Sequence, residues 1–124
     1  MFRDLLFVFI GGGIGSVVRF GISMLMLNYY KTTFPLATLF SNVLSCAVLG
    51  LTVFLLGEKF NTEMSLRLLI ITGFCGGFST FSAFGFDTVL LMRSGYVAYA
   101  VLNVLLSVSV CIGIIYLFTR STAS

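Results

Sequence analysis

The sequence contains no histidine and few charged residues, and each shortage excludes a class of protein. Without histidine, and without a nucleophile set beside a base, hydrolytic or metal-assisted catalysis has no machinery, so we predict that the protein is not an enzyme. Charged residues make up 9% of the chain and form no basic run, so no nucleic-acid partner is implied. The three cysteines, Cys46, Cys75 and Cys111, lie in apolar stretches, where we expect them to be packing residues.

Hydrophobic residues are abundant instead, at 59% of the 124 residues, with a mean hydropathy of +1.14. This composition is typical of an integral membrane protein. Each of the four apolar stretches meets the requirement of ~20 residues for a helix that crosses ~30 Å of hydrocarbon. The stretches are residues 5–27, 36–56, 66–92 and 97–118. Short links between them predict an all-α membrane protein with a single four-helix transmembrane domain over residues 1–124. The alternative is that the N-terminus, where Arg3 precedes an apolar run, is a cleaved signal peptide, but the run is too long for one and three further spans follow.

The third stretch contains the most informative segment, residues 73–84, which reads GFCGGFSTFSAF. Glycine disfavours a helix interior by roughly 1 kcal/mol, and lipid tolerates irregular backbone only where it is buried in protein or lines a polar cavity. Residues 66–92 would also span roughly 40 Å as a straight helix, which is longer than the hydrocarbon core requires. We therefore predict that the third helix is broken near its middle, close to Gly76 and Gly77, beside a permeation path.

The distribution of basic residues gives only a weak signal for orientation. Four basic residues fall on the side of both termini, namely Arg3, Lys59, Arg67 and Arg120. Lys31 and Arg93 fall on the other side, and Arg19 lies nearer to that side. Because loop Lys and Arg normally fix orientation, so small a difference predicts insertion in both directions. The alternative is that a partner subunit or the insertion machinery sets the orientation.

Polar and small residues follow single faces of the first two stretches. Gly11, Gly15 and Arg19 are four residues apart, which predicts a face that another helix approaches closely. Arg19 would then either extend to the headgroups or attract anions. In the second stretch, which begins after Pro35, a shared face carries Thr38, Asn42 and Ser45. Asn42 suits either a bond between helices or an anion path that needs an amide donor.

The third and fourth stretches add hydroxyls, aromatic rings and one carboxylate. Carbonyls freed at the break would bind a monovalent cation, or Ser and Thr hydroxyls would bond back to the preceding turn. Phe81 and Phe84 share a face, and their ring edges are suited to a dehydrated anion. Asp87 suggests either a structural or a functional role. In the fourth stretch, Asn103, Ser107 and Cys111 form a polar stripe that we expect to face the third helix.

Three segments resemble the CrcB or Fluc family of small fluoride channels, and the likeness covers essentially the full chain. The segments are residues 11–19 (GGGIGSVVR), 37–42 (ATLFSN) and the specific 73–84. The resemblance implies a fluoride channel of the cell inner membrane that exports fluoride passively. It also implies an antiparallel, dual-topology homodimer with two anion pores and one structural sodium ion where the two broken third helices cross.

The resemblance also assigns roles by position. It implies sodium ligands at the backbone carbonyls of Gly76 and Ser79 of each subunit. The residues that it implies for the anion pathway are Asn42, Phe81, Phe84, Thr38, Ser82 and Ser107, with Asn103 at a position that varies across the family. We expect Arg19 to raise the local anion concentration at the mouth. The chain departs from the family pattern at Ala83 (usually a hydroxyl residue), Asp87 (usually glutamate), Ser79 (often threonine) and Ala37 (commonly glycine).

Two other functions remain open from the residues. A small multidrug exporter with proton-coupled cation transport needs a carboxylate in its binding chamber, and residues 5–27 contain none. A membrane assembly subunit without transport activity would use the polar residues only to hold helices together.

Overall fold

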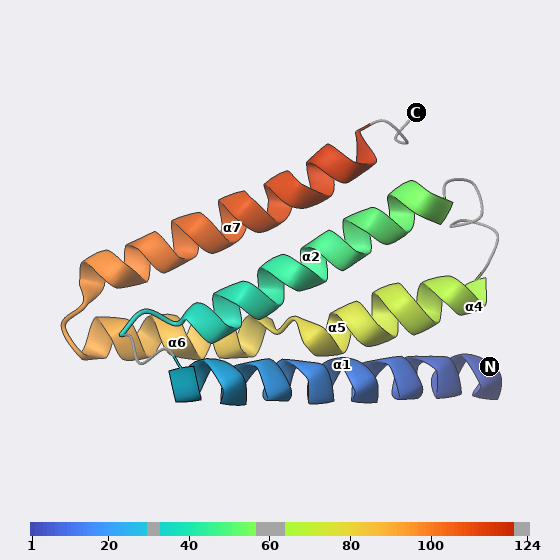
Figure 1. Ribbon diagram of the computed structural model, residues 1–124, viewed down its shortest axis with the longest axis horizontal. Coiled ribbons are helices and arrows are strands. Elements are labelled where there is room, and N and C mark those ends of the chain that lie inside the picture. Colours follow the sequence, from blue (N-terminus) through green and yellow to red (C-terminus); the bar gives the residue numbers. More distant parts are fainter. Residues whose placement is uncertain (30–32, 57–63, 121–124) are drawn as a thin grey trace.

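The computed structural model describes residues 1–29, 33–56 and 64–120, and all its regular elements there are helical (Figure 1). Four spans are long and apolar enough to cross a membrane, which confirms the predicted all-α, four-span fold. They are α1 (Phe2–Tyr29), α2 (Leu36–Leu56), the composite third span Met64–Arg93 and α7 (Val97–Thr119). The third span consists of α4 (Met64–Leu66), the π-helix η1 (Arg67–Cys75), α5 (Gly76–Phe78) and α6 (Phe81–Arg93).

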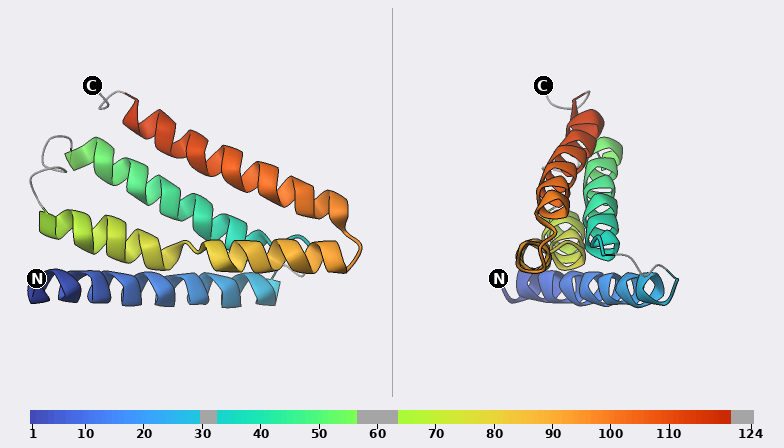
Figure 2. Two further views of the ribbon diagram at one scale, coloured as in Figure 1. Left: turned by 180° about the vertical axis from the view of Figure 1, so that it is seen from behind. Right: turned by 90° about the vertical axis from the view of Figure 1, so that its left-hand side faces the viewer.

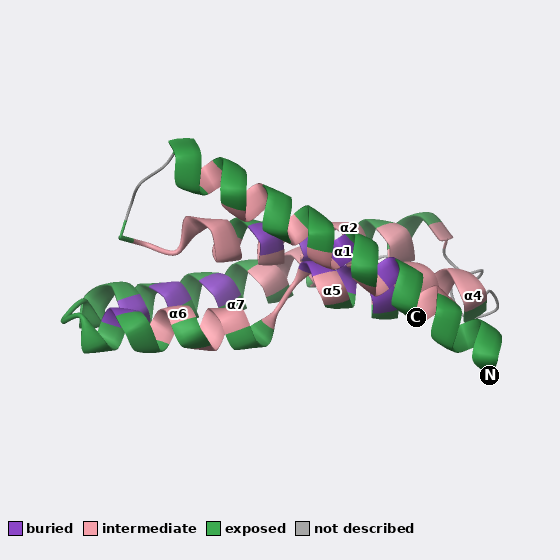
Figure 3. Cartoon of the chain, turned by 90° about the horizontal axis from the view of Figure 1, so that it is seen from below, coloured by how far each residue is buried: buried purple, intermediate pink, exposed green. Residues whose placement is uncertain are grey.

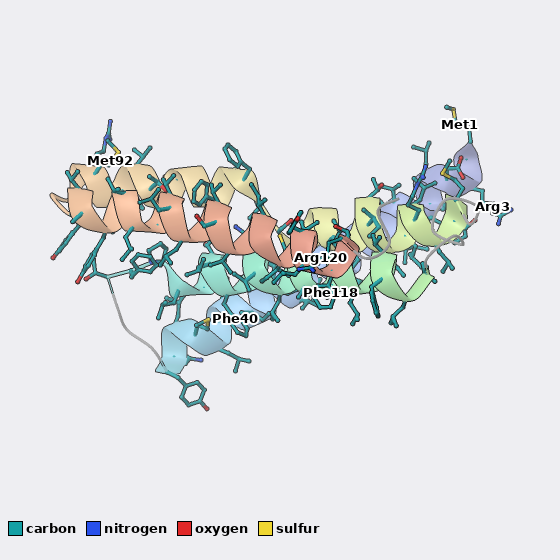
Figure 4. The ribbon with its side chains drawn as sticks, turned by 90° about the horizontal axis from the view of Figure 1, so that it is seen from above. Met1, Arg3, Phe40, Met92, Phe118 and Arg120 are labelled. Atoms are coloured by element: carbon teal, nitrogen blue, oxygen red, sulfur yellow. The ribbon has the colours of Figure 1, made fainter. Side chains whose placement is uncertain are left out.

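Successive spans run in opposite directions (Figure 1). α1 packs on the first half of the third span, η1 and α5, and α2 packs on α7 (Figure 2). The N-terminus and the end of α7 lie at one end of the molecule (Figure 1). Arg3 lies at this end and Met92 at the other (Figure 4). Gly95, which has a positive φ of 89°, forms the turn that reverses the chain between α6 and α7. The predicted cations Lys31 and Lys59 lie outside the described residues.

Glycines let α1 pack directly on the backbone of the third span. A Cβ on Gly15 would overlap the carbonyl oxygen of Phe74, and a Cβ on Gly11 would overlap that of Leu69. A Cβ on Gly77 would likewise overlap the carbonyl oxygen of Gly12. Side chains larger than hydrogen would separate the helices, so the predicted close-approach face of the first span is confirmed.

The break in the third span lies at Ser79 and Thr80, near the middle of the span. These two residues are extended, with φ and ψ of −96° and 149° at Ser79 and −147° and 124° at Thr80. The break therefore lies close to Gly76 and Gly77, as predicted, but two residues later, because both glycines are themselves helical. Gly77 is used for close packing against α1, and the helix ends two residues later.

Apart from Gly50, which packs against Phe118 of α7, the buried residues form two groups (Figure 3). The first lies where α1 and α2 meet η1 and α5, and consists of Gly11, Gly15, Ser41, Ser45, Gly73, Cys75 and Phe78. The second lies between α6 and α7 and consists of Leu91, Ala100, Asn103 and Ser107. Most other positions are partly or fully exposed, including many large apolar side chains. Such a surface suits lipid or a second subunit rather than water.

Candidate functional site

Asn42 of α2 holds the break of the third span. Its Oδ1 accepts a hydrogen bond from the Thr80 N–H at 3.1 Å. Because the Thr80 N–H is a donor, the Asn42 atom that faces it must be the oxygen. This assigns the orientation of the side-chain amide and leaves the Nδ2 group as a hydrogen-bond donor for another partner. Thr80 in turn caps α6, because its Oγ1 accepts from the Ala83 N–H at 3.4 Å.

The same two bonds release two backbone carbonyls. In an unbroken helix the Thr80 N–H would pair with the Gly76 carbonyl, and the Ala83 N–H with that of Ser79. Both donors are used elsewhere, by Asn42 and by the Thr80 hydroxyl. The carbonyls of Gly76 and Ser79 therefore lose their regular helical donors. The Ser79 hydroxyl bonds back to the Cys75 carbonyl at 2.7 Å, as the alternative from the sequence allowed.

Arg19 of α1 contacts the half-helix that precedes the break, whereas Asn42 of α2 contacts the break itself. The Nε of Arg19 donates to the Gly77 carbonyl at 3.2 Å, so the guanidinium lies at the C-terminal end of the half-helix. A cation is favoured there because the end of a helix carries partial negative charge. The sequence suggested a headgroup contact or anion attraction, and neither reading included this bond to the backbone.

A cavity of about 270 Å³ opens beside the break. It is lined by Asn42, Cys46, Ser79, Thr80, Phe81, Phe84, Ser107, Val108, Cys111 and Ile112. The rings of Phe81 and Phe84 lie 5.6 Å apart and are tilted by 46°. Phe81 is 83% exposed, so its ring forms the open edge of the cavity. The structure thus brings together four residues expected on the pathway, namely Asn42, Phe81, Phe84 and Ser107.

The first turn of α6 adds hydrogen-bond donors beside this cavity. A helix begins with N–H groups that have no partner within the helix and with partial positive charge, and both favour an anion. Ser82, in this first turn, is exposed, and its Oγ lies 2.9 Å from Thr80 Oγ1. The break therefore brings an amide and two aromatic rings to one cavity, with the start of α6 beside it.

Asn103 lies outside the cavity lining, in a buried network between α6 and α7. Its Nδ2 donates to Thr88 Oγ1 at 3.0 Å, and its Oδ1 accepts from Ser107 Oγ at 3.3 Å. Thr88 donates onward to the Phe84 carbonyl at 2.8 Å. Asn103 of the polar stripe thus faces the third span, as expected, and the network connects Ser107 to the backbone at Phe84, whereas Cys111 lines the cavity with Cys46 of α2.

Thr38 and Asp87 line a second cavity of about 370 Å³, between the ends of α1, α2 and α6. The Thr38 hydroxyl donates to Asp87 Oδ2 at 2.7 Å. Ser23 and Tyr96 also line this cavity, and the sequence reading missed them. Ser23 continues the row of Gly15 and Arg19 at a spacing of four, which was an available signal.

The polar face of α2 bonds to the third span along much of its length. Besides the bonds of Thr38 and Asn42, Ser45 Oγ donates to the Cys75 carbonyl at 3.0 Å, and Cys75 Sγ lies 3.5 Å from the Ser45 carbonyl. Cys75 is buried, as expected of a packing residue. Among the described residues, no cluster of three or more His, Cys, Asp or Glu side chains is present to hold a metal.

Fold and site together define a multi-pass membrane protein whose third span is interrupted beside a small polar and aromatic cavity. A family model described as CrcB-like protein, Camphor Resistance (CrcB), matches residues 6–119. The chain belongs to this family.

Relatives that are similar in sequence carry the name fluoride-specific ion channel FluC. The protein from Shewanella pealeana is 41% identical over 115 residues, covering 93% of this chain and 92% of the relative. That from Serratia proteamaculans is 42% identical over 109 residues, covering 88% and 85%. That from Rhizobium etli is 47% identical over 88 residues, covering 71% and 70%. These are names of ion channels, in agreement with the prediction that the chain is not an enzyme.

Proposed function

We propose that this protein is a passive fluoride channel that lowers cytoplasmic fluoride. The observation that carries the proposal is the cavity at the break, where the Asn42 amide, the start of α6 and the rings of Phe81 and Phe84 meet. The named activity of relatives that are about 40% identical over most of the chain supports fluoride as the ion.

A dehydrated fluoride ion needs donors to replace its water, and this site supplies partial rather than full charges. The Asn42 Nδ2 group and the α6 N–H groups would donate hydrogen bonds, and the positive ring edges would stabilise the ion more weakly. Weak, distributed contacts let an ion leave as readily as it enters. The guanidinium of Arg19, bonded to Gly77, adds a positive potential near the break without occupying the path.

The pathway would be completed by a second, antiparallel copy of the chain. The ring of Phe81 is exposed at the open edge of the cavity, and Gly76 is also exposed. A second copy would cover both, and the weak difference in basic residues between the two sides allows both insertions. Two copies would give two pores, in each of which Thr38, Ser82, Ser107 and Asn103 would border the path or support the residues that do.

A sodium ion suits the carbonyl oxygens at the break. The carbonyls of Gly76 and Ser79 have lost their helical donors, and unwound backbone carbonyls are the usual sodium ligands where membrane helices are interrupted. The two carbonyls from each subunit would hold the ion. When bound, it would neutralise partial negative charge where the two broken helices cross. No carboxylate is required for this site.

Fluoride efflux from liposomes that contain the purified protein tests the function. We expect passive efflux that Asn42→Ala reduces about tenfold or more, since loss of this part-buried hydrogen bond costs about 1–3 kcal/mol. Ser45→Ala is the matched control, because it also removes one bond between α2 and the third span but lies outside the cavity lining. Equal effects of the two substitutions, or no efflux from the unaltered protein, would refute the assignment. Omission of sodium during purification should weaken the dimer.

A further inference from the structure

Two thiols from different helices meet in the wall of the cavity at the break. Cys46 of α2 and Cys111 of α7 both line it, so the two side chains face one space. Both cysteines are free and half-buried. Cys111 lies one turn after Ser107, so the thiol pair faces the same space as the polar residues of the site.

We propose that Cys46 and Cys111 bind a soft divalent metal ion in two-coordinate fashion, with Hg²⁺ as the probe. Thiolates are the preferred ligands of soft metals. Each thiol would lose its proton to solvent as its sulfur–metal bond forms, so two protons are released for each ion bound and nothing is oxidised or reduced.

The coordination number follows from the surroundings. Among the described residues no group of three or more His, Cys, Asp or Glu side chains is present, so a four-coordinate ion such as zinc would lack ligands. Val108 and Ile112 line the same cavity and make its wall apolar. Two thiolates and one divalent cation form a neutral complex, which avoids the cost of a net charge in apolar surroundings. A monovalent soft cation would leave a negative charge there.

Cys75 offers a matched control within the same chain. It is 3% exposed, and its thiol lies against the Ser45 carbonyl rather than in the cavity. Substitution of Cys75 therefore removes one thiol from the chain without removing either proposed ligand.

Binding is tested on the purified, full-length protein by mercury titration, read by thiolate-to-mercury absorbance and by metal content after washing with glutathione. We expect one mercury per chain in the unaltered protein and in Cys75→Ser. Cys46→Ser and Cys111→Ser should each retain mercury about a hundredfold less tightly, because a chelating pair gains at least that factor over one thiol. Retention that is unchanged in both variants, or lost in Cys75→Ser, would overturn the proposal.

A second measurement needs no variant. In the unaltered protein, bound mercury should protect Cys46 and Cys111 together from alkylation by N-ethylmaleimide, as read by peptide mass spectrometry. Protection of only one of the two would also overturn the proposal.

A functional consequence rests on the proposed fluoride channel. Mercury at this pair would occupy the cavity and bridge α2 to α7, so it should stop fluoride efflux. The block should be lost in Cys46→Ser and Cys111→Ser and kept in Cys75→Ser, each compared with its own rate before mercury. Absence of fluoride efflux before mercury is added would contradict the channel and leave the absorbance result standing. Normal efflux with mercury bound would contradict the placement of the pair on the path.

Discussion

Replacing Gly15 with alanine should separate α1 from the third span. A Cβ at Gly15 would overlap the Phe74 carbonyl and lie 2.8 Å from the Phe78 nitrogen, and both obstacles are backbone atoms that no rotamer change can move. Restoring an ordinary contact of 3.4 Å to that nitrogen moves α1 outward by at least about 0.6 Å. A shift of this size would lengthen the Arg19–Gly77 bond from 3.2 Å to beyond hydrogen-bond reach.

The expected magnitude follows from two opposing effects. Overpacking costs about 1–3 kcal/mol, and the upper end applies because the obstacles are rigid. Alanine gains at most about 1 kcal/mol over glycine within a helix. We therefore expect Gly15→Ala to lower the free energy of unfolding by about 2 kcal/mol. Gly13→Ala, where a Cβ meets nothing within 4 Å, should leave it unchanged or raise it by up to about 1 kcal/mol.

Unfolding of the two variants by sodium dodecyl sulfate in bicelles, followed by circular dichroism, measures the difference. The rate of fluoride efflux should be lower in Gly15→Ala, in parallel with its lower free energy of unfolding. In Gly13→Ala it should stay near the rate of the unaltered protein. Equal shifts in the unfolding midpoint for the two variants would show that the close approach of α1 to the third span is wrong.

Two further predictions concern the path itself. Phe81→Ile keeps the apolar bulk but removes the ring edge, so fluoride efflux should fall about tenfold with the dimer intact, while Phe86→Ile, which is exposed outside the cavity, should leave efflux near normal. Gel filtration and the efflux assay check both, and equal losses would contradict the role of the ring. Asp87→Asn removes a negative charge beside Thr38, so efflux should rise up to about twofold at low salt, and the gain should vanish at high salt. A proton-dependent cation flux lost in this variant would instead revive the exporter alternative.

The sequence predicted the four spans and the existence of the break because membrane thickness limits helix length, and residues 66–92 exceeded that limit. It placed the break two residues too early because glycine has two uses, as a helix breaker and as a small residue for packing. The presence of Gly12 opposite Gly77 decides between these uses, and spacing along one helix does not reveal the facing helix.

The residues of the site were predicted better than their bonds. The shared face of Thr38, Asn42 and Ser45 was evident from spacings of four and three, and each does bond to the third span. Sequence alone did not predict that Asn42 would accept a hydrogen bond from the Thr80 N–H, since this bond depends on how α2 packs against the third span. Nor did it predict the backbone bond of Arg19, because a carbonyl is present at every residue and becomes available only where the helix ends.

Comparison of fluoride and chloride efflux in one preparation of sodium-containing proteoliposomes tests the central claim, that the cavity at the break conducts a small dehydrated anion. We predict fluoride efflux that needs neither a proton gradient nor ATP, with chloride efflux no faster than in protein-free vesicles. Chloride efflux equal to that of fluoride, or no anion efflux from a folded dimer, would contradict the account.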